Sequence, residues 1–370
     1  MADAAGLILV VNAGSSSCKL RLLGHDDAVL RTADLPAIEG SDAGVVGDAI
    51  ARWPTPGAVG HRVVHGGTRF AAPVVLDGDA IAGIESLTPL APLHQPRSLA
   101  AIHAVRAALP ALPHVAAFDT AFHATLPAAA VTYAIPAEWR SLGVRRYGFH
   151  GLSHAYASRR AATLAGRTGD AAFRVVTCHL GAGSSLAAVL GGRSVDTTMG
   201  FTPLEGLVMA TRSGTIDPGI VTWLIEQQGV AAADVTDALE HRSGLLALAG
   251  TDDMRDVLAR ARDGDAEATL ALDVYVHRLR TSIGAMAASL RGLDALVFTG
   301  GVGERSARVR ALAADGLAFL GVAVDDAAND AATGSADAEI SDAGARVRTF
   351  VIAAREDVEI ARQARQALGR

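Results

Sequence analysis

Residues 7–19 read LILVVNAGSSSCK, and this stretch decides the fold. A run of Leu, Ile and Val leads into the turn residues 12–14, which predicts a buried strand that ends in a tight turn. Backbone N–H groups, three serine hydroxyls and the Lys19 ammonium then follow closely enough to form an anion cradle. The GxxxxGK[ST] pattern of a P-loop is absent, so a plain hairpin with solvated serines is the alternative interpretation.

A second stretch near the middle of the chain repeats this pattern. Residues 175–185, VVTCHLGAGSS, again run from an apolar strand into a Gly-Ser turn, and the two Gly-Ser-Ser steps lie about half a chain apart. Two such units predict a duplicated domain with a phosphate site facing each copy. Lys19 is the only lysine among 33 basic residues, which favours a functional ammonium there, and chance retention of one surface lysine is the alternative.

Composition limits the function classes. The 370 residues exceed one ordinary domain and predict two, and 50% hydrophobic with 19% charged residues is typical of a globular protein. A net charge of −6 argues against a nucleic-acid or membrane-surface partner. Cys18 and Cys178 are expected to be small buried side chains rather than a disulfide. The sequence shows neither a signal-peptide pattern nor a membrane-spanning run, so we expect a cytoplasmic protein.

Three further segments concentrate polar side chains near predicted strands. Arg62 lies in the Val-rich segment 58–67, where burial requires a carboxylate partner or a ligand anion. Asp119 directly follows the predicted strand 114–118, a common place for a metal ligand or catalytic group, although a helix cap is the alternative. The segment 144–154, VRRYGFHGLSH, predicts a loop over the active site.

The second half contains one long irregular segment, residues 197–219, which is rich in Gly, Thr and Pro and favours a functional loop. Other predictions rest on periodicity and on turn residues. They are a helix at 97–109, a core-facing helix at 267–290, a strand at 293–298, a glycine loop at 300–303, a surface loop at 325–345, a strand at 347–352 and a C-terminal helix.

Ten stretches together closely resemble the acetate kinase family, a branch of the acetate and sugar kinase, heat-shock ATPase and actin superfamily. They occur in family order and cover essentially the whole chain. The stretches are NAGSSSCKL, GHRVVHGG, APLHQP, FDTAFHATLP, RRYGFHGLSH, CHLGAGSS, TTMGFTPLEGL, ATRSGTIDPG, FTGGVGE and REDVEIAR.

The resemblance implies an α/β protein with a duplicated ribonuclease-H-like fold and an active-site cleft between two domains. Residues 1–124, completed by a C-terminal helix at 358–370, would form the first domain, and residues 125–357 the nucleotide-binding second. The family transfers a phosphoryl group in line between ATP and acetate, uses Mg²⁺, with Mn²⁺ as a possible substitute, and forms homodimers. Acetate is ionised at neutral pH and needs no general base, so positioning and charge neutralisation remain the tasks of the protein.

The resemblance also implies roles for individual residues. The catalytic residues would be Arg62, Asp119, His150 and Arg212. The metal would lie near Asn12, Asp119 and Glu356. The acetate methyl group would contact Val64, Leu93, Phe149 and Pro203, next to Arg62. Phosphate and nucleotide would bind Ser15, Ser17, Lys19, His179, Gly181, Gly183, Asp253, Met254, Arg255, Gly301 and Gly303.

The chain departs from the family pattern at several points. Ala182 stands where Asn is usual, Gln95 replaces another Asn, and Arg305 follows Glu304 where Asn is frequent. These changes leave nucleotide affinity and phosphate-donor preference open. Two alternatives also remain: a kinase that prefers propionate or butyrate, and a non-catalytic nucleotide-binding module of the same fold.

Overall fold

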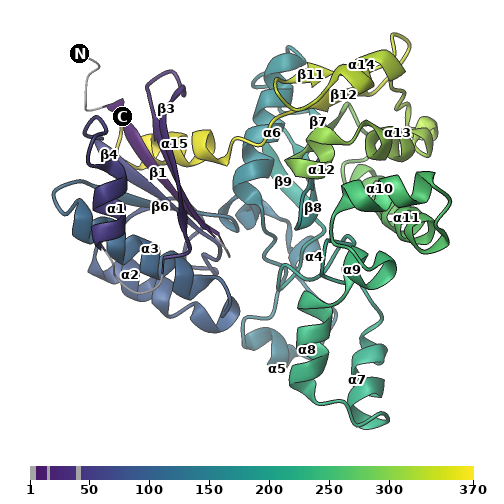
Figure 1. The fold of residues 1–370 in the computed structure, drawn as a ribbon, viewed down its shortest axis with the longest axis horizontal. Coiled ribbons are helices and arrows are strands. Elements are labelled where there is room, and N and C mark those ends of the chain that lie inside the picture. The colour runs from purple at the N-terminus through teal and green to yellow at the C-terminus, as the bar shows by residue number, and fades with distance from the viewer. Residues whose placement is uncertain (1–5, 15–16, 39–42) are drawn as a thin grey trace. The chain divides into compact units, whose positions relative to one another are not determined.

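The computed structural model describes residues 6–14, 17–38 and 43–370. The chain divides into two compact units. The first comprises Met1–Ala124, Phe149–Tyr156 and Arg355–Arg370, and the second comprises Thr125–Gly148 and Ala157–Ala354. The sequence led us to expect residues 149–156 and 355–357 in the second domain, whereas the structure places them in the first unit. Within the described residues each unit contains one six-stranded sheet (Figure 1).

The sheet of the first unit has the strand order β3-β2-β1-β4-β6-β5. Strand β1 pairs antiparallel with β2 and parallel with β4, and β4 pairs parallel with β6. The opening stretch is therefore a β-hairpin, with Ala13 opposite Cys18 and an amide hydrogen bond from Gly14 to the Ser17 carbonyl. The strands are β1 Ile8–Ala13, β2 Ser17–Leu23, β3 Val29–Pro36, β4 Ala58–Val63, β5 Val74–Val75 and β6 His114–Phe118.

The sheet of the second unit repeats this topology, with the order β11-β12-β10-β7-β8-β9. Strand β7 pairs antiparallel with β8 and parallel with β10, as β1 does with β2 and β4. The two Gly-Ser turns therefore close equivalent hairpins, which confirms the predicted duplication. The strands are β7 Arg174–Leu180, β8 Ser184–Leu190, β9 Arg193–Thr197, β10 Ala295–Thr299, β11 Ala338–Glu339 and β12 Arg348–Val351.

Helices cover the sheets. The helices are α1 Ala43–Ile50, α2 Gly78–Glu85, α3 Gln95–Ala108, α4 Ala128–Val131, α5 Ala137–Ser141, α6 Gly151–Leu164, α7 Pro218–Glu226, α8 Ala232–His241, α9 Gly244–Ala249, α10 Met254–Arg262, α11 Ala266–Ser289, α12 Gly300–Arg305, α13 Ala307–Asp315, α14 Asp326–Ala331 and α15 Glu356–Ala367. Helix α11 begins where the Asp265 carboxylate accepts the N–H groups of Glu267 and Ala268. Its buried stripe packs into the core of the second unit, as its apolar spacing predicts.

The last helix completes the first unit. In Figure 1 α15, drawn in yellow, lies against the first sheet, where Ile360, Ala361 and Ala364 join the core with Ile8 of β1. A Cβ at Gly60 would lie 2.7 Å from Ile360 Cγ2, so the glycine lets the helix approach the strand. This packing holds the C-terminal segment beside the N-terminal strand. Glu356, in the first turn of α15, contacts Asn12 although 344 positions separate the two residues in the sequence.

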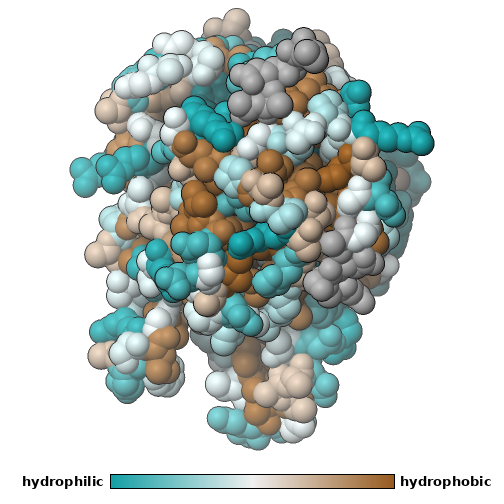
Figure 2. Space-filling view, turned by 90° about the vertical axis from the view of Figure 1, so that its left-hand side faces the viewer, coloured by the Kyte–Doolittle hydropathy of each residue, from teal (hydrophilic) through white to brown (hydrophobic). Residues whose placement is uncertain are grey.

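The opposite face of the first sheet packs against α1 and α3, and a cavity of about 230 Å³ lies there. Figure 2 views the molecule from the left-hand side of Figure 1, and apolar side chains gather near the middle of that face. Cys18 and Cys178 are both free and buried, as expected from the sequence. In the part of the chain that the structure describes, no helix is both long and apolar enough to cross a membrane.

Two sequence predictions about loops are wrong. The glycine run 300–303 forms the short helix α12, because Glu304 accepts the Gly300 N–H and closes its first turn. The segment 325–345 contains α14 and β11 instead of being a surface loop. Asp325 caps α14 by accepting the Ala328 N–H, and β11 pairs with β12 at the sheet edge, which composition alone does not reveal.

Candidate active site

Three parallel strands of the first unit end side by side, and each delivers a polar side chain to one cluster. Arg62 of β4 makes a bidentate pair with Asp119, which follows β6, and the shortest distance is 2.6 Å from Nη2 to Oδ2. Its Nη1 donates to Asn12 Oδ1 of β1 at 3.1 Å. The Asn12 amide in turn donates to Glu356 Oε2 at 3.1 Å, at the start of α15. Four residues predicted from the sequence therefore lie together.

Burial controls the charges of this cluster. The carboxylates of Asp119 and Glu356 outweigh the effect of burial and raise the pKa of the Arg62 guanidinium, which stays charged. Burial raises the pKa of Asp119, the Arg62 guanidinium opposes that shift, and Glu356 adds to it. Two carboxylates around one guanidinium leave negative charge at the carboxyl ends of the strands.

This donor set fits a magnesium ion that is shared with phosphate. Among the described residues, no three His, Cys, Asp or Glu side chains gather as a complete metal site. Mg²⁺ is usually held by one or two carboxylates, with substrate phosphates and water as its remaining ligands. Asp119 and Glu356 would supply those two carboxylates, and the Asn12 amide donates a hydrogen bond to the second of them.

His150 adopts a backbone conformation that few side chains tolerate. Its φ is +56°, in the left-handed region, directly before α6. The N–H of Gly151 donates to the Asp119 carbonyl at 2.9 Å, and a Cβ at Gly151 would lie only 2.1 Å from that oxygen. The close approach fixes His150 next to the backbone of Asp119. Strained backbone of this kind occurs frequently at functional sites.

Three residues of the first hairpin were predicted to bind phosphate, and the structure describes two of them, Ser17 and Lys19. Lys19 lies directly opposite Asn12 in the antiparallel register, and cross-strand neighbours of this type share one face of the sheet. Its side chain is exposed, which suits an ammonium that meets a soluble anion. The Ser17 carbonyl closes the turn by accepting the Gly14 N–H at 2.8 Å. Ser15 lies outside the described residues.

The residues expected around the acetate methyl group are not joined by any described contact. Val64 and Phe149 are both buried in the first unit, and Phe149 packs its edge against His65 at 5.5 Å. Leu93 is half exposed on the loop before α3, and Pro203 belongs to the second unit. The acyl pocket therefore stays a prediction.

Three buried histidines of the first unit predict acid sensitivity. His61 Nε2 lies 2.9 Å from His114 Nδ1, and burial lowers the pKa of both, with further lowering by Arg106. Burial also lowers the pKa of His65 to about 4. These residues stay neutral in the fold but take up protons in the unfolded chain near their ordinary pKa of 6.5. The contribution of these histidines to the free energy of unfolding is therefore fully present above pH 6.5 and is lost as the pH falls from there towards 4.

We expect the free energy of unfolding to be lower at pH 5 than at pH 7.5, with His65 alone contributing about 2 kcal/mol, at about 1.4 kcal/mol per pH unit. Urea unfolding followed by circular dichroism measures this difference. In the variant His61→Leu/His114→Leu the pH dependence should be shallower. A wild-type protein equally stable at both pH values would contradict the prediction.

In the second unit Arg212 differs from Arg62 in that no carboxylate pairs with it among the described residues. Among the described residues, the Arg212 side chain makes one hydrogen bond, from Nη1 to the Pro203 carbonyl at 2.7 Å, and no ion pair. Burial lowers the pKa of this guanidinium, and Glu240 only partly offsets it. Most of its N–H donors are thus uncommitted although the side chain is partly buried. Such a guanidinium is suited to bind an anion.

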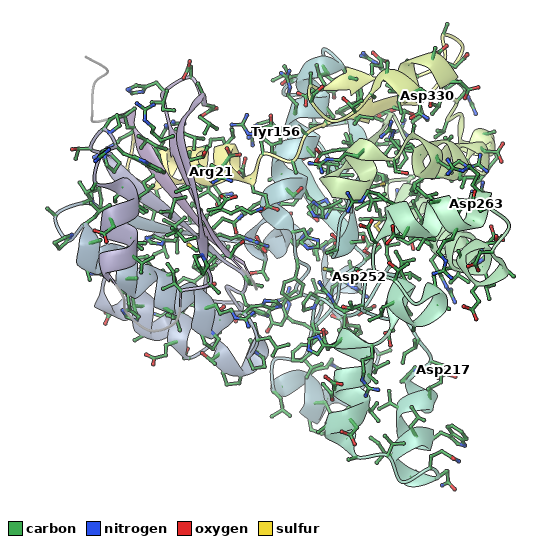
Figure 3. The ribbon with its side chains drawn as sticks, in the orientation of Figure 1. Arg21, Tyr156, Asp217, Asp252, Asp263 and Asp330 are labelled. Carbon is green, nitrogen blue, oxygen red and sulfur yellow. The ribbon has the colours of Figure 1, made fainter. Side chains whose placement is uncertain are left out.

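A cavity of about 520 Å³ lies in the same unit, a size typical of small-molecule sites. It is lined by Gly181, Ala182, Ala210, Leu245, Asp252, Asp253, Met254, Arg255, Leu258, Tyr275, Gly301, Val302, Arg305 and Ser306. Asp252 is labelled in Figure 3. The lining includes five of the eight phosphate and nucleotide residues that were predicted in the second unit, from three separate stretches of sequence, together with the departures Ala182 and Arg305.

Three predicted residues of the second unit do not line this cavity. His179 and Gly183 flank the turn, where the Gly181 N–H donates to the Gly183 carbonyl at 3.1 Å. Gly303 is buried inside α12, and its carbonyl accepts a hydrogen bond from Arg310. Tyr275 and Leu245 also line the cavity and were not predicted from the sequence. For Tyr275 the available signal was its place on the periodic apolar face of α11.

Sequence and structure comparisons agree on one family. A model described as the acetokinase family matches residues 55–362. The acetate kinase of Deinococcus deserti is 46% identical, with 98% of both chains covered, and that of Gloeobacter violaceus is 51% identical over 84% of this chain and 77% of its own.

Solved structures give the same result. The acetate kinase of Porphyromonas gingivalis has a TM-score of 0.90 at 35% identity, covering 98% of this chain and 100% of its own. A propionate kinase from Francisella tularensis also reaches 0.90, at 36% identity, covering 98% of this chain and 99% of its own. The predicted duplicated ribonuclease-H-like fold is therefore confirmed, and this chain belongs to the acetokinase family.

Proposed function

We propose that the protein is an acetate kinase, which transfers the γ-phosphoryl group of ATP reversibly to acetate and forms acetyl phosphate and ADP. The observation that carries the proposal is the cluster of Asn12, Arg62, Asp119 and Glu356 at the carboxyl ends of three parallel strands, in a chain of the acetokinase family. As a member of that family the protein is a phosphotransferase with a carboxyl group as acceptor.

The proposed reaction is a direct displacement. An acetate oxygen forms a bond to the γ-phosphorus while the bond to the ADP oxygen breaks, so no proton has to be removed from the nucleophile. The main task is to neutralise charge on the equatorial phosphoryl oxygens. Arg62, His150 and Arg212 would donate hydrogen bonds to those oxygens. Mg²⁺, or Mn²⁺ in its place, would offset phosphate charge when held by Asp119 and Glu356.

The cavity of the second unit would take the nucleotide. Asp253, Met254, Arg255 and Gly301 line it and would contact the adenosine, with Gly303 supporting the backbone of α12. The turn from His179 through Gly181 to Gly183 would face the phosphates. In the first unit Ser15, Ser17 and Lys19 would do the same from the opening hairpin.

A second candidate acceptor is propionate, because one of the similar solved structures is described as a propionate kinase. Val64, Leu93, Phe149 and Pro203 would contact the acyl chain. One methylene group changes binding in an apolar pocket by only about 1–3 kcal/mol, so preference among short acids depends on the exact size of this pocket.

A hydroxamate assay with ATP and Mg²⁺ tests both the activity and the acceptor. We expect acyl phosphate formation with kcat/KM highest for acetate, about tenfold or more lower for propionate, and lower again for butyrate. Omitting Mg²⁺ should reduce the product to background. Propionate preferred over acetate would select the second candidate. ATP binding without any acyl phosphate would instead indicate a non-catalytic nucleotide-binding module.

We also propose a homodimer in the cytoplasm. Helix α7 buries none of its residues and exposes Ile220, Trp223 and Ile225, and Figure 1 shows it beside α8 at one end of the second unit. A second copy of the chain would cover this apolar face, and light scattering over a range of concentrations tests for it. The free thiols Cys18 and Cys178 and the use of ATP support the location.

A further inference from the structure

Glu205 lies in the irregular segment between β9 and α7, and each of its two carboxylate oxygens has a side-chain partner. The Tyr133 hydroxyl donates to its Oε2 at 2.5 Å, and Arg146 Nη2 lies 2.6 Å from its Oε1. Burial and the hydrogen bond to Glu205 raise the pKa of Tyr133, so the phenol stays protonated and donates. Phe201 closes the group by donating its backbone N–H to the same phenol oxygen at 3.0 Å.

The same arginine also binds the start of the segment. Arg146 Nη1 donates to the carbonyls of Thr198 and Met199 at 3.1 and 3.0 Å. Its guanidinium lies over the Tyr133 ring, 5.4 Å from the centroid. A Cβ at Gly200 would lie 1.8 Å from Glu205 Oε2, so only glycine allows the carboxylate to reach this position. The segment is thus held by side chains where no helix or strand holds it.

This segment carries the atom that orients Arg212. The Pro203 carbonyl, two residues before Glu205, accepts the only side-chain hydrogen bond of Arg212 within the described residues. The segment rejoins the chain near Arg212 through two hydrogen bonds between Gly206 and Thr215, at 2.9 and 3.1 Å. Any movement of Glu205 would therefore shift the carbonyl that sets the direction of the guanidinium.

We propose that Glu205, held by Tyr133 and Arg146, is a positioning residue that fixes the Pro203 carbonyl and through it the Arg212 guanidinium. The inference rests on the proposed kinase function. Positioning errors of about 1 Å are sufficient to cost a catalyst about 100-fold. The residues that line the nucleotide cavity are not members of this group, so its loss should affect turnover more than nucleotide binding.

The test compares Glu205→Gln with the matched control Glu339→Gln. Glutamine keeps the size of the side chain and can still accept from Tyr133, but it loses the ion pair with Arg146. Glu339 makes an exposed ion pair with Arg348 at 2.5 Å, elsewhere in the same unit. In the hydroxamate assay we expect Glu205→Gln to lower kcat at least tenfold, with KM for ATP within twofold of wild type. Glu339→Gln should match wild type in both.

A double-mutant cycle separates positioning from a merely structural role. If Glu205 acts through Arg212, adding Glu205→Gln to Arg212→Ala should lower kcat no further. A full additional tenfold loss, or unchanged kcat in Glu205→Gln, would overturn the inference. Tyr133→Phe provides a second variant should Glu205→Gln fail to fold, and the same loss of kcat is expected. If the wild-type protein forms no acyl phosphate, the proposed kinase function fails together with the inference. If the wild type is active and Glu205→Gln keeps its kcat, only the positioning role of Glu205 fails.

Discussion

Arg212→Ala is expected to lower kcat by two or more orders of magnitude and to leave the thermal midpoint unchanged or slightly raised. Removing one preorganised donor from a charged transition state typically costs a factor of about 100 to 1,000. The stability should not fall, because the partly buried guanidinium has no carboxylate partner among the described residues and makes one hydrogen bond. Its removal relieves a desolvated charge and leaves only the Pro203 carbonyl without its donor.

The hydroxamate assay and a thermal scan measure both parts of this prediction. Arg242→Ala is the matched control, because Arg242 is an exposed arginine of the same unit that pairs with Asp237 at 2.8 Å. Its kcat should stay within twofold of wild type. Arg212→Lys tests the geometry, since an ammonium keeps the charge but cannot reproduce the planar fork. Activity of Arg212→Ala within tenfold of wild type would rule out the role proposed for this side chain.

Arg62→Ala is expected to lower kcat to a similar extent and, unlike Arg212→Ala, to destabilise the protein. The Arg62 and Asp119 side chains are 17% and 2% exposed, so the substitution leaves a carboxylate buried without its partner. Breaking such a pair by removing one member typically costs about 3–5 kcal/mol. Asn12 also loses the donor to its amide oxygen, which loosens its contact with Glu356.

Urea unfolding and the hydroxamate assay distinguish these effects. Arg62→Ala/Asp119→Asn should recover part of the stability, because the lone buried charge is gone, but none of the activity. Arg21→Ala is the control in the same sheet. Arg21 pairs with the exposed carboxylate of Asp34 at 2.6 Å, and exposed pairs contribute at most about 1 kcal/mol. If Arg62→Ala lowers the free energy of unfolding no more than Arg21→Ala does, the buried pair does not stabilise this site.

Two arginines with the same proposed role thus differ in what they do for the fold. Arg62 is neutralised by a permanent carboxylate and contributes to stability. Arg212 is held by one carbonyl and leaves its charge for a ligand.

The local patterns of the sequence were sufficient for the hairpins and the core helix. Apolar runs that end in Gly-Ser turns predicted β1 and β7, and apolar spacing predicted α11 to within one residue at each end. The polar, acidic stretch from residue 24 to about residue 50 gave no prediction of a helix or strand, and it contains β3 and α1. Both elements depend on packing against neighbours, because β3 exposes most of its residues and the apolar face of α1 is short.

The sequence by itself determined the repeated strand-and-turn units, because strand periodicity and turn residues are local properties of the backbone. Its resemblance to the family over ten stretches determined the family and the residue types of the site. Only the tertiary structure decided that Asn12 meets Glu356 across 344 residues, that His150 takes a left-handed conformation, and which arginine has a counter-ion. Those features depend on which side chains the folded sheets bring together. Glu205 is of the same kind: its stretch is readable in the sequence, but its partners Tyr133 and Arg146 become visible only in the fold.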